Sequence, residues 1–177
     1  MTQGDSRDPI VAFFSGGPDF QGRTLDAILA WSDDELEAVH DYVQWVFPTR
    51  QPSAVNPLVP TVTSDTVQAF ERGRALRDQL QRAFDRMLAF YGLRHAATGE
   101  IEIDSERFPA RANNWLHPGN HNHLRLTRIM DSLATLGLRD QAIALQRCLL
   151  ADVCAGPGKG RISPRTTEFW RKAVGGI

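Results

Sequence analysis

The sequence has little cysteine and no long apolar run. Its two cysteines, Cys148 and Cys154, lie in a segment with helical periodicity, which separates them by about 9 Å along the axis at about 1.5 Å per residue. A disulfide cannot bridge that separation, so we expect two reduced thiols. No stretch approaches the roughly 18 apolar residues of a membrane-spanning helix, and the apolar run 10–14 is too short for a signal peptide. We therefore expect a cytoplasmic protein without a transmembrane segment.

The chain also lacks an excess of charge of either sign. Its 20 basic and 21 acidic residues give a net charge of −1, and the basic residues are dispersed, so no nucleic-acid partner is expected. The charge is nevertheless uneven: residues 1–48 carry nine acids and two bases (−7), whereas residues 49–177 carry eighteen bases and twelve acids (+6). Solvated helix faces account for this pattern, or the two ends steer a partner electrostatically.

Familiar catalytic motifs are absent as well. There is no Gly-x-Ser-x-Gly string, and no nucleophile–base pair can be identified. The turn over residues 156–160 resembles a phosphate-binding loop only superficially, because Val153 stands where that motif has glycine and Gly160 where it has serine or threonine. Whether the chain is an enzyme stays open, with binding favoured over catalysis, and we expect no cofactor.

Apolar residues recur with a helical period through most of the chain. The 177 residues suit one domain, and we predict an all-α fold of about six to seven helices. Residues 1–9 are expected to form a disordered N-terminus and residues 10–177 the helical domain. The four prolines within residues 48–62 predict a long crossing loop between helices.

Several boundaries follow from caps and breakers. Ser32, with glutamate three residues later, begins a helix that should continue to Phe47, where the next proline stops it. Residues 75–91 should form a long helix that a glycine ends. Residues 100–104 alternate and predict a brief strand without an obvious partner, and residues 105–119 look irregular.

The densest polar cluster spans residues 117–128. On a helix starting near Gly119 or Asn120, His121, Arg125 and Arg128 share a face, whereas Asn122 points toward the core and could hold the preceding loop.

Three interpretations of this cluster stay open. It is structural, or it is an anion site at a helix N-terminus, or it is a metal site of His117, His121 and His123, although Pro118 breaks the helix between these ligands. Two arginines so near a helix N-terminus are better explained if a negative group meets them. That group is either internal, such as Asp41 or another carboxylate of the acidic N-terminal third, or a carboxylate or phosphate of a ligand.

A second cluster spans residues 40–48. His40, Gln44 and Phe47 share one helical face, while the valines between them pack inward. Tyr42 and Trp45 combine an apolar ring with a polar tip. Such residues are typical of interfaces, but they also occur in a core helix with internal hydrogen bonds.

Together the two clusters resemble the conserved region of the opioid growth factor receptor family. The strings that carry the resemblance are His-Asp-Tyr-Val-Gln-Trp-Val-Phe-Pro (40–48), Asn-Pro (56–57), Met-Leu-Ala-Phe-Tyr-Gly (87–92), His-Asn-His-Leu-Arg-Leu-Thr-Arg-Ile (121–129) and Leu-Asp-Ala-Ile-Leu-Ala-Trp (25–31). The resemblance covers about residues 10–175. It implies a helical domain and, for vertebrate members, a perinuclear receptor for Met-enkephalin. We expect a compact bacterial member, because the composition is rich in Ala, Arg, Leu and Asp, and therefore a natural ligand other than enkephalin.

We predict a receptor-like binding surface between the helix that ends at Pro48 and the helix that starts near Asn120. Its candidate residues are His40, Gln44, Trp45, Asn56, Trp115, Asn120, His121, His123, Arg125 and Arg128. Its partner would be a small ligand, a peptide or a protein, and no catalytic or metal-binding residue is assigned. The alternative is a metal-dependent or acid–base enzyme that uses His40, His117, His121 and His123.

Overall fold

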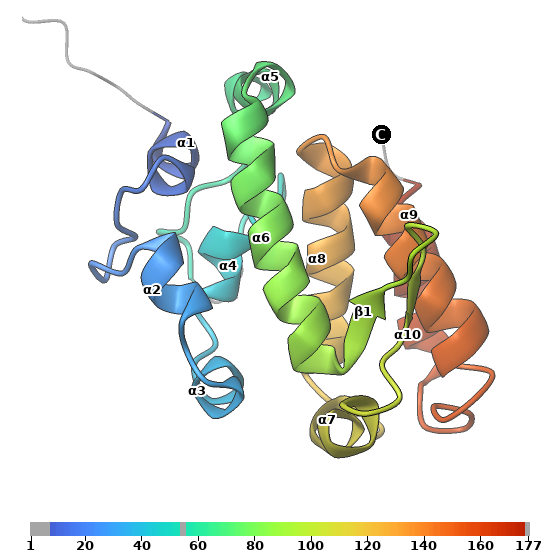
Figure 1. Cartoon of the computed structure of the whole chain (residues 1–177). Coiled ribbons are helices and arrows are strands. Elements are labelled where there is room, and N and C mark those ends of the chain that lie inside the picture. Colours follow the sequence, from blue (N-terminus) through green and yellow to red (C-terminus); the bar gives the residue numbers. More distant parts are fainter. Residues whose placement is uncertain (1–7, 54–55, 176–177) are drawn as a thin grey trace, which may run out of the picture.

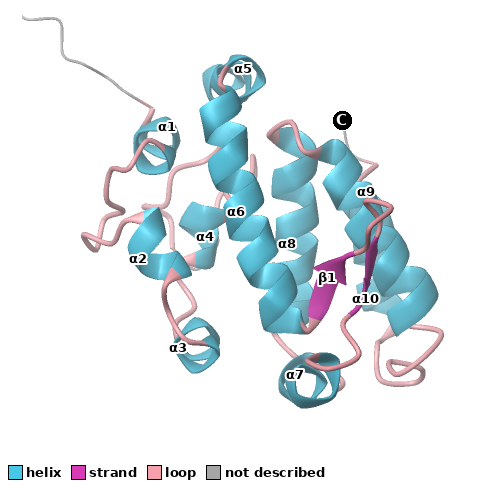
Figure 2. Cartoon of the chain, viewed as in Figure 1, coloured by secondary structure: helices cyan, strands magenta, loops and turns pink. Residues whose placement is uncertain are grey.

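The computed structural model of the chain describes residues 8–53 and 56–175. Its elements, in chain order, are α1 (Pro9–Phe14), α2 (Leu25–Leu29), α3 (Asp33–Ala38), α4 (Val43–Val46), α5 (Ser64–Arg72), α6 (Arg74–Tyr91), β1 (Leu93–His95), β2 (Ile101–Ile103), α7 (Phe108–Trp115), α8 (Asn122–Thr135), α9 (Arg139–Arg147), the π-helix η1 (Cys148–Val153) and α10 (Pro164–Ala173). The expected predominance of helix is confirmed (Figure 2). The expected number of helices is wrong, because ten α-helices lie within the described ranges. Most of the expected disordered N-terminus, residues 1–7, lies outside them.

The long helices α6 and α8 lie in the middle of the molecule (Figure 1), and the Tyr91 hydroxyl of α6 donates to Asn122 Oδ1 of α8. The short helices α1 to α4 lie on one side of α6, and α9 and α10 pack against α8 on the other. The core between them is rich in fully buried aromatic side chains: Phe13, Phe70, Phe84, Trp115 and Trp170. Within the described ranges, no helix is long and apolar enough to cross a membrane.

Local capping explains several helix starts. Ser32 and Glu35 form the predicted capping box at the start of α3. Ser163 caps α10, whose first residue is Pro164. At the C-terminal end of α6, Gly92 adopts φ +75°, and a Cβ there would lie 2.6 Å from the Cα of Phe108. Glycine is therefore needed both to end α6 and to let α7 approach it.

The predicted continuous helix over residues 32–47 is wrong. α3 ends at Ala38, Val39 is extended (ψ 131°), and α4 begins only at Val43. Five residues near α4 are buried: Tyr42, Val43, Trp45, Val46 and Phe47. A single straight helix would turn some of these side chains to solvent, since neighbouring positions point about 100° apart. The break separates the orientation of α4 from that of α3, and all five side chains are buried, including Phe47, which was expected to share a face with His40 and Gln44.

The region after α6 is more ordered than predicted. The strand expected near residues 100–104 is present as β2, and its partner, which the sequence did not reveal, is β1 directly after Gly92, with Leu93 opposite Ile103. Residues 105–119 are not irregular, because they contain α7. A proline in the first turn of α7 and the Asp104 carboxylate, which accepts the Glu106 and Arg107 N–H groups, support its start.

The proline-rich segment 48–62 does not match the predicted crossing loop. The Val62 N–H donates to the Thr49 carbonyl oxygen at 3.0 Å. The two ends of the segment are therefore adjacent, and the segment forms a loop that does not cross the domain. Residues 54 and 55 within it lie outside the described part of the chain.

The two cysteine thiols are free, as expected. Cys148 is buried in η1, and burial raises its pKa to about 12. Such a thiol behaves as a small apolar side chain and is a poor nucleophile.

Candidate functional site

The two polar clusters meet in space. The His40 ring, just beyond α3, lies edge-on to the His121 ring at the start of α8, with 4.9 Å between their centroids. A cleft of about 180 Å³ opens here, lined by His40, Val43, Gln44, His121, Leu124, Arg125 and Arg128. We call it the His40–Arg128 cleft. It contains five of the ten predicted site residues.

Arg125 forms the inner wall of this cleft and is only 5% exposed. Its Nη1 donates to the Leu36 carbonyl oxygen at 3.0 Å, and its Nη2 donates to the Val39 carbonyl oxygen at 2.9 Å. The last carbonyls of a helix have no partner within the helix and carry partial negative charge. Arg125 therefore holds the end of α3, which explains how α3 can stop in the middle of the apolar pattern.

Arg128, one turn later on α8, does the same for α4. Its Nη1 donates to the Phe47 carbonyl oxygen at 3.2 Å. The negative groups that the arginines were expected to need are thus mainly the carbonyl ends of two short helices. The expected partner Asp41 is wrong, because its carboxylate pairs with Arg23 at 3.0 Å. Another carboxylate of the N-terminal third does pair with Arg125, that of Glu37 at 3.8 Å.

The hydrogen bond between Arg125 and His40 fixes the tautomer of His40. Arg125 Nη2 lies 3.0 Å from His40 Nδ1. A guanidinium can only donate, so Nδ1 accepts and Nε2 carries the proton. His40 is exposed, so this proton is available to a ligand.

Asn122 is fully buried, as the sequence predicted. Its Oδ1 accepts the Tyr91 hydroxyl at 3.3 Å, and its Nδ2 donates to Glu37 Oε2 at 3.0 Å. It therefore joins α6, α3 and α8 and does not hold the preceding loop. Asn120 holds that loop: its Nδ2 donates to the Asn114 carbonyl oxygen at 2.9 Å, and its Oδ1 accepts the Asn122 N–H at 2.8 Å.

Replacement of Asn122 by leucine is expected to lower the free energy of unfolding by about 1–3 kcal/mol, because Tyr91 and Glu37 lose buried hydrogen-bond partners. Equilibrium urea denaturation measures the change. Asn113→Leu is the matched control, since Asn113 is exposed on α7 and should change stability little. Equal effects of the two substitutions would contradict the role of Asn122 in joining the three helices.

His121 and His123 have different environments. The His121 Nε2 lies 3.1 Å from Glu37 Oε1 at the edge of the cleft. Burial, followed by the positive charge of Arg125, lowers the pKa of His121, although Glu37 opposes the shift. His123 points inward, where its Nε2 hydrogen-bonds the Trp115 carbonyl oxygen at 3.0 Å, and burial lowers its pKa too. Both pKa values therefore lie below the ordinary value for histidine, which favours the neutral imidazole.

Besides His40, Arg128 and Gln44 have unused hydrogen-bonding capacity in the cleft. Burial lowers the pKa of Arg128, with Asp131 as the opposing charge, but within the described ranges Arg128 forms no ion pair. Gln44 Nε2 donates to Ser53 Oγ at 2.9 Å, whereas its Oε1 is buried without a hydrogen-bond partner among the described residues. The half-buried guanidinium of Arg128 and the amide of Gln44, with its unpaired oxygen, therefore belong to the same cleft.

The other five predicted site residues, Asn120 among them, do not line the cleft. Trp45 packs against Phe13 in the core, and the indole N–H of Trp115 donates to the Tyr91 carbonyl oxygen at 3.2 Å. The remaining two are Asn56, whose N–H donates to Ser53 Oγ, and the buried His123.

Sequence reasoning missed Leu124, which is 64% exposed. Its spacing from His121 and Arg128 would have revealed it, since these positions share one helical face. Leu124 also lines a second groove of about 540 Å³, together with Asn120, Thr127, Arg165 and Phe169 among others. The exposed Leu124 side chain thus lines both the His40–Arg128 cleft and this groove.

The alternative metal site is not formed. His117 Nε2 lies 2.9 Å from Asn120 Nδ2, His121 faces His40, and His123 is turned into the core. Across residues 8–53 and 56–175, no three His, Cys, Asp or Glu side chains are grouped so that they could hold a metal ion.

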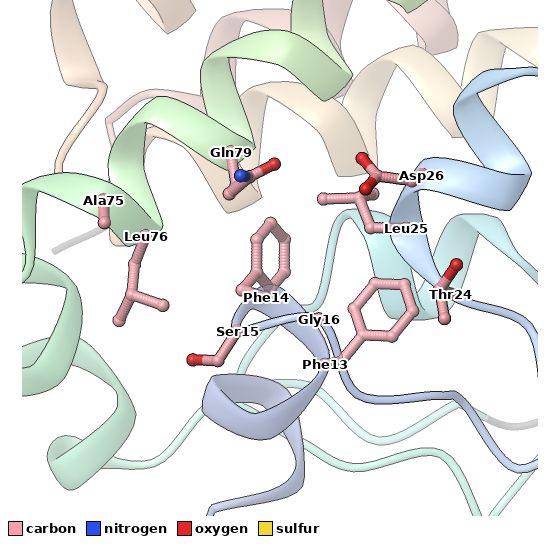
Figure 3. A pocket seen from close by; sticks show the side chains of 10 residues that line it. All are labelled: Phe13, Phe14, Ser15, Gly16, Thr24, Leu25, Asp26, Ala75, Leu76 and Gln79. Atoms are coloured by element: carbon pink, nitrogen blue, oxygen red, sulfur yellow. The ribbon is translucent and has the colours of Figure 1, made fainter.

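A separate pocket of about 410 Å³ lies between α1, α2 and α6 (Figure 3). Phe13, Phe14 and Leu25 form its apolar wall. Its polar groups already have partners: the Ser15 hydroxyl donates to the Val11 carbonyl oxygen at 2.7 Å, and Asp26 pairs with Arg82 at 2.9 Å. This pocket contains none of the predicted site residues.

Comparison with known proteins gives a clear result. A family model described as the opioid growth factor receptor (OGFr) conserved region matches residues 20–174. The opioid growth factor receptor of Rattus norvegicus is 39% identical over 149 residues, covering 80% of this chain and 25% of the relative. That of Homo sapiens is 36% identical over 130 residues (72% and 19%), and the opioid growth factor receptor-like protein 1 of Mus musculus is 33% identical over 115 residues (60% and 23%).

The chain thus spans a quarter or less of the length of these relatives. They are vertebrate proteins, so they give no support to the bacterial source expected from composition. No solved structure matches the chain.

Proposed function

Because the chain belongs to the family of the opioid growth factor receptor conserved region, we propose that it is a receptor-like binding domain. Its ligand, a peptide, a protein segment or a small molecule, would occupy the His40–Arg128 cleft. The observation that carries this proposal is the meeting of two polar clusters, distant in sequence, around a half-buried cation and an unpaired amide oxygen.

The unused groups of the cleft define the chemistry of the ligand. Arg128 favours a negatively charged group, since hydrogen bonds to a charged partner are stronger than neutral ones. Gln44 Oε1 needs a donor, because a buried acceptor without a partner costs about 1–3 kcal/mol. His40 Nε2 offers a further donor, and Leu124 an apolar surface beside them. A peptide with a carboxylate, backbone N–H groups and an apolar side chain supplies all the matching groups.

Arg125 has a different role in this proposal. Its guanidinium is engaged by Leu36, Val39, Asn122 and His40, so it does not contact the ligand directly. It positions His40 and the end of α3. Arg128 is therefore the arginine that meets the ligand.

The test is peptide binding by the chain and by Arg128→Gln. A pool of short peptides with free carboxyl termini is added to isotope-labelled protein, and amide chemical shifts are followed by NMR. We expect shifts at Gln44, Leu124 and Arg128, and an affinity for the best peptide that falls about tenfold in the variant, through loss of a charged hydrogen bond.

Arg139→Gln is the matched control, because Arg139 is exposed at the start of α9. It should bind the same peptide as the parent does. Shifts confined to other surfaces, or equal affinities in Arg128→Gln and Arg139→Gln, would rule out this cleft as the binding site.

A second candidate function, acid–base catalysis, rests on the His121–Glu37 pair at 3.1 Å. A carboxylate that orients an imidazole is a recurring part of general-base sites. However, Glu37 also accepts the Asn122 amide, and among the described residues no hydroxyl or thiol hydrogen-bonds to His121. The pair is therefore better explained as part of the wall of a binding cleft.

A cytoplasmic location is part of the proposal. It is supported by the two free thiols, because a reducing compartment keeps cysteines unpaired.

A further inference from the structure

A second polar cleft lies between α6, α7 and the start of α3. Its volume is about 580 Å³, and it is lined by Asp33, Arg86, Ala89, Arg107, Ala110 and Arg111. We call it the arginine cleft. It shares no lining residue with the His40–Arg128 cleft.

Backbone carbonyls hold two of the three arginines in place. Arg86 Nη2 donates to the Trp31 carbonyl oxygen at 2.8 Å, and Arg111 Nε donates to the Phe90 carbonyl oxygen at 2.8 Å. The Arg111 guanidinium also lies over the Phe90 ring, 4.9 Å from its centroid. These contacts orient both guanidinium groups before any ligand arrives, which lowers the entropic cost of binding.

The cleft has more positive than negative charge. One carboxylate, that of Asp33, serves two arginines, at 2.8 Å from Arg86 Nη1 and 3.3 Å from Arg111 Nη1. The third, Arg107, is 63% exposed and has only a long contact of 3.9 Å to Asp104. Three positive charges and one negative charge line the cleft, which leaves an excess of two positive charges.

The hydrogen bonds of Arg111 are incomplete. Its Nη2 is buried and has no hydrogen-bond partner among the described residues. A buried N–H donor without a partner is costly, particularly on a charged group. Arg111 lines the cleft, so a ligand oxygen that reaches this Nη2 would remove that cost.

We propose that the arginine cleft binds the phosphate group of a small phosphate monoester. A phosphate dianion matches the excess of two charges, and its several oxygens suit the fork of donors that arginine presents. Ala89 and Ala110 also line the cleft, and their short side chains leave room for the organic part of the ligand. The volume also falls within the roughly 300–1,000 Å³ of small-molecule sites.

The test is calorimetric titration with phenyl phosphate at low, constant ionic strength, with inorganic phosphate as the second probe. Arg107→Gln is the main variant, because Arg107 is exposed and its loss should leave the fold intact. We expect saturable binding of phenyl phosphate, tighter than that of inorganic phosphate, and a dissociation constant about tenfold higher in Arg107→Gln.

Two controls separate this site from general charge effects and from the peptide cleft. Arg147→Gln removes an exposed arginine that pairs with Glu100 elsewhere, and Arg128→Gln removes the cation of the His40–Arg128 cleft. Both should bind phenyl phosphate like the parent.

Arg111→Lys keeps the positive charge but removes the forked N–H donors of the guanidinium. It should therefore weaken the binding of phenyl phosphate, as Arg107→Gln does. Three results would each overturn the proposal: no saturable binding, equal losses in Arg107→Gln and Arg147→Gln, or no preference for phenyl phosphate over inorganic phosphate.

Discussion

Replacement of Arg125 by alanine is expected to lower the free energy of unfolding by about 3–5 kcal/mol, the range observed when one partner of a buried charged network is removed. The substitution leaves the Leu36 and Val39 carbonyl oxygens without their donor and the Glu37 carboxylate without its neighbouring cation. It also leaves a cavity, which adds to the loss. Equilibrium denaturation of parent and variant measures the change.

The matched control is Arg94→Ala. Arg94 forms an exposed ion pair with Glu102 in the small sheet, and exposed pairs contribute about 0–1 kcal/mol. Added phosphate or an acidic peptide should not restore the stability of Arg125→Ala, because the missing interactions are with backbone carbonyls inside the protein. A loss below about 1 kcal/mol, or a recovery of stability with anions, would show that Arg125 serves a ligand instead of α3.

Arg125 also explains why the end of α3 could not be predicted from the sequence. The capping box at Ser32 is local, so the start of α3 could be predicted from neighbouring residues. The end of α3 depends on Arg125, which lies far along the chain, and on Tyr42, whose hydroxyl donates to the Leu36 carbonyl oxygen. Periodicity within residues 32–47 contains no information about either contact. A helix that ends by tertiary contacts could not be distinguished from one that continues.

The errors after α6 have a similar cause. β1 follows Gly92 directly and has only three residues, so it has no periodicity of its own until β2 pairs with it. The eight residues of α7 include two adjacent asparagines, which are weak helix formers. What holds α7 is Trp115, buried against Tyr91 at its end, and the close approach that Gly92 permits. These are tertiary contacts.

Helical phase alone predicted which of the proposed site residues share a face. His121, Arg125 and Arg128 share a face of α8, and that face meets His40 and Gln44 as expected. The prediction failed for aromatic residues with polar tips, because Trp45 and Trp115 suit an interface and a core equally well in sequence. Their burial could be decided only by packing.

The adjacent residues Phe169 and Trp170 in α10 directly test the difference between an aromatic side chain at the surface and one in the core. Trp170→Ala is expected to lower the free energy of unfolding by about 3–5 kcal/mol, as for other fully buried aromatic side chains. The indole is completely buried, its N–H donates to the His123 carbonyl oxygen at 3.1 Å, and the His123 ring packs against it at 5.9 Å. The substitution would therefore release α10 from α8, and thermal or urea unfolding measures the loss.

Phe169→Ala is the control within the same helix. Phe169 is 38% exposed, lies under the Arg165 guanidinium at 5.5 Å, and lines the groove beside Leu124. Its removal should change stability by no more than about 0.5 kcal/mol, as is usual for surface substitutions. Comparable losses in the two variants would mean that Phe169 also anchors α10. A stable Trp170→Ala variant would mean that α10 is not needed to close the core, and that the groove beside Leu124 is not held in shape by this helix.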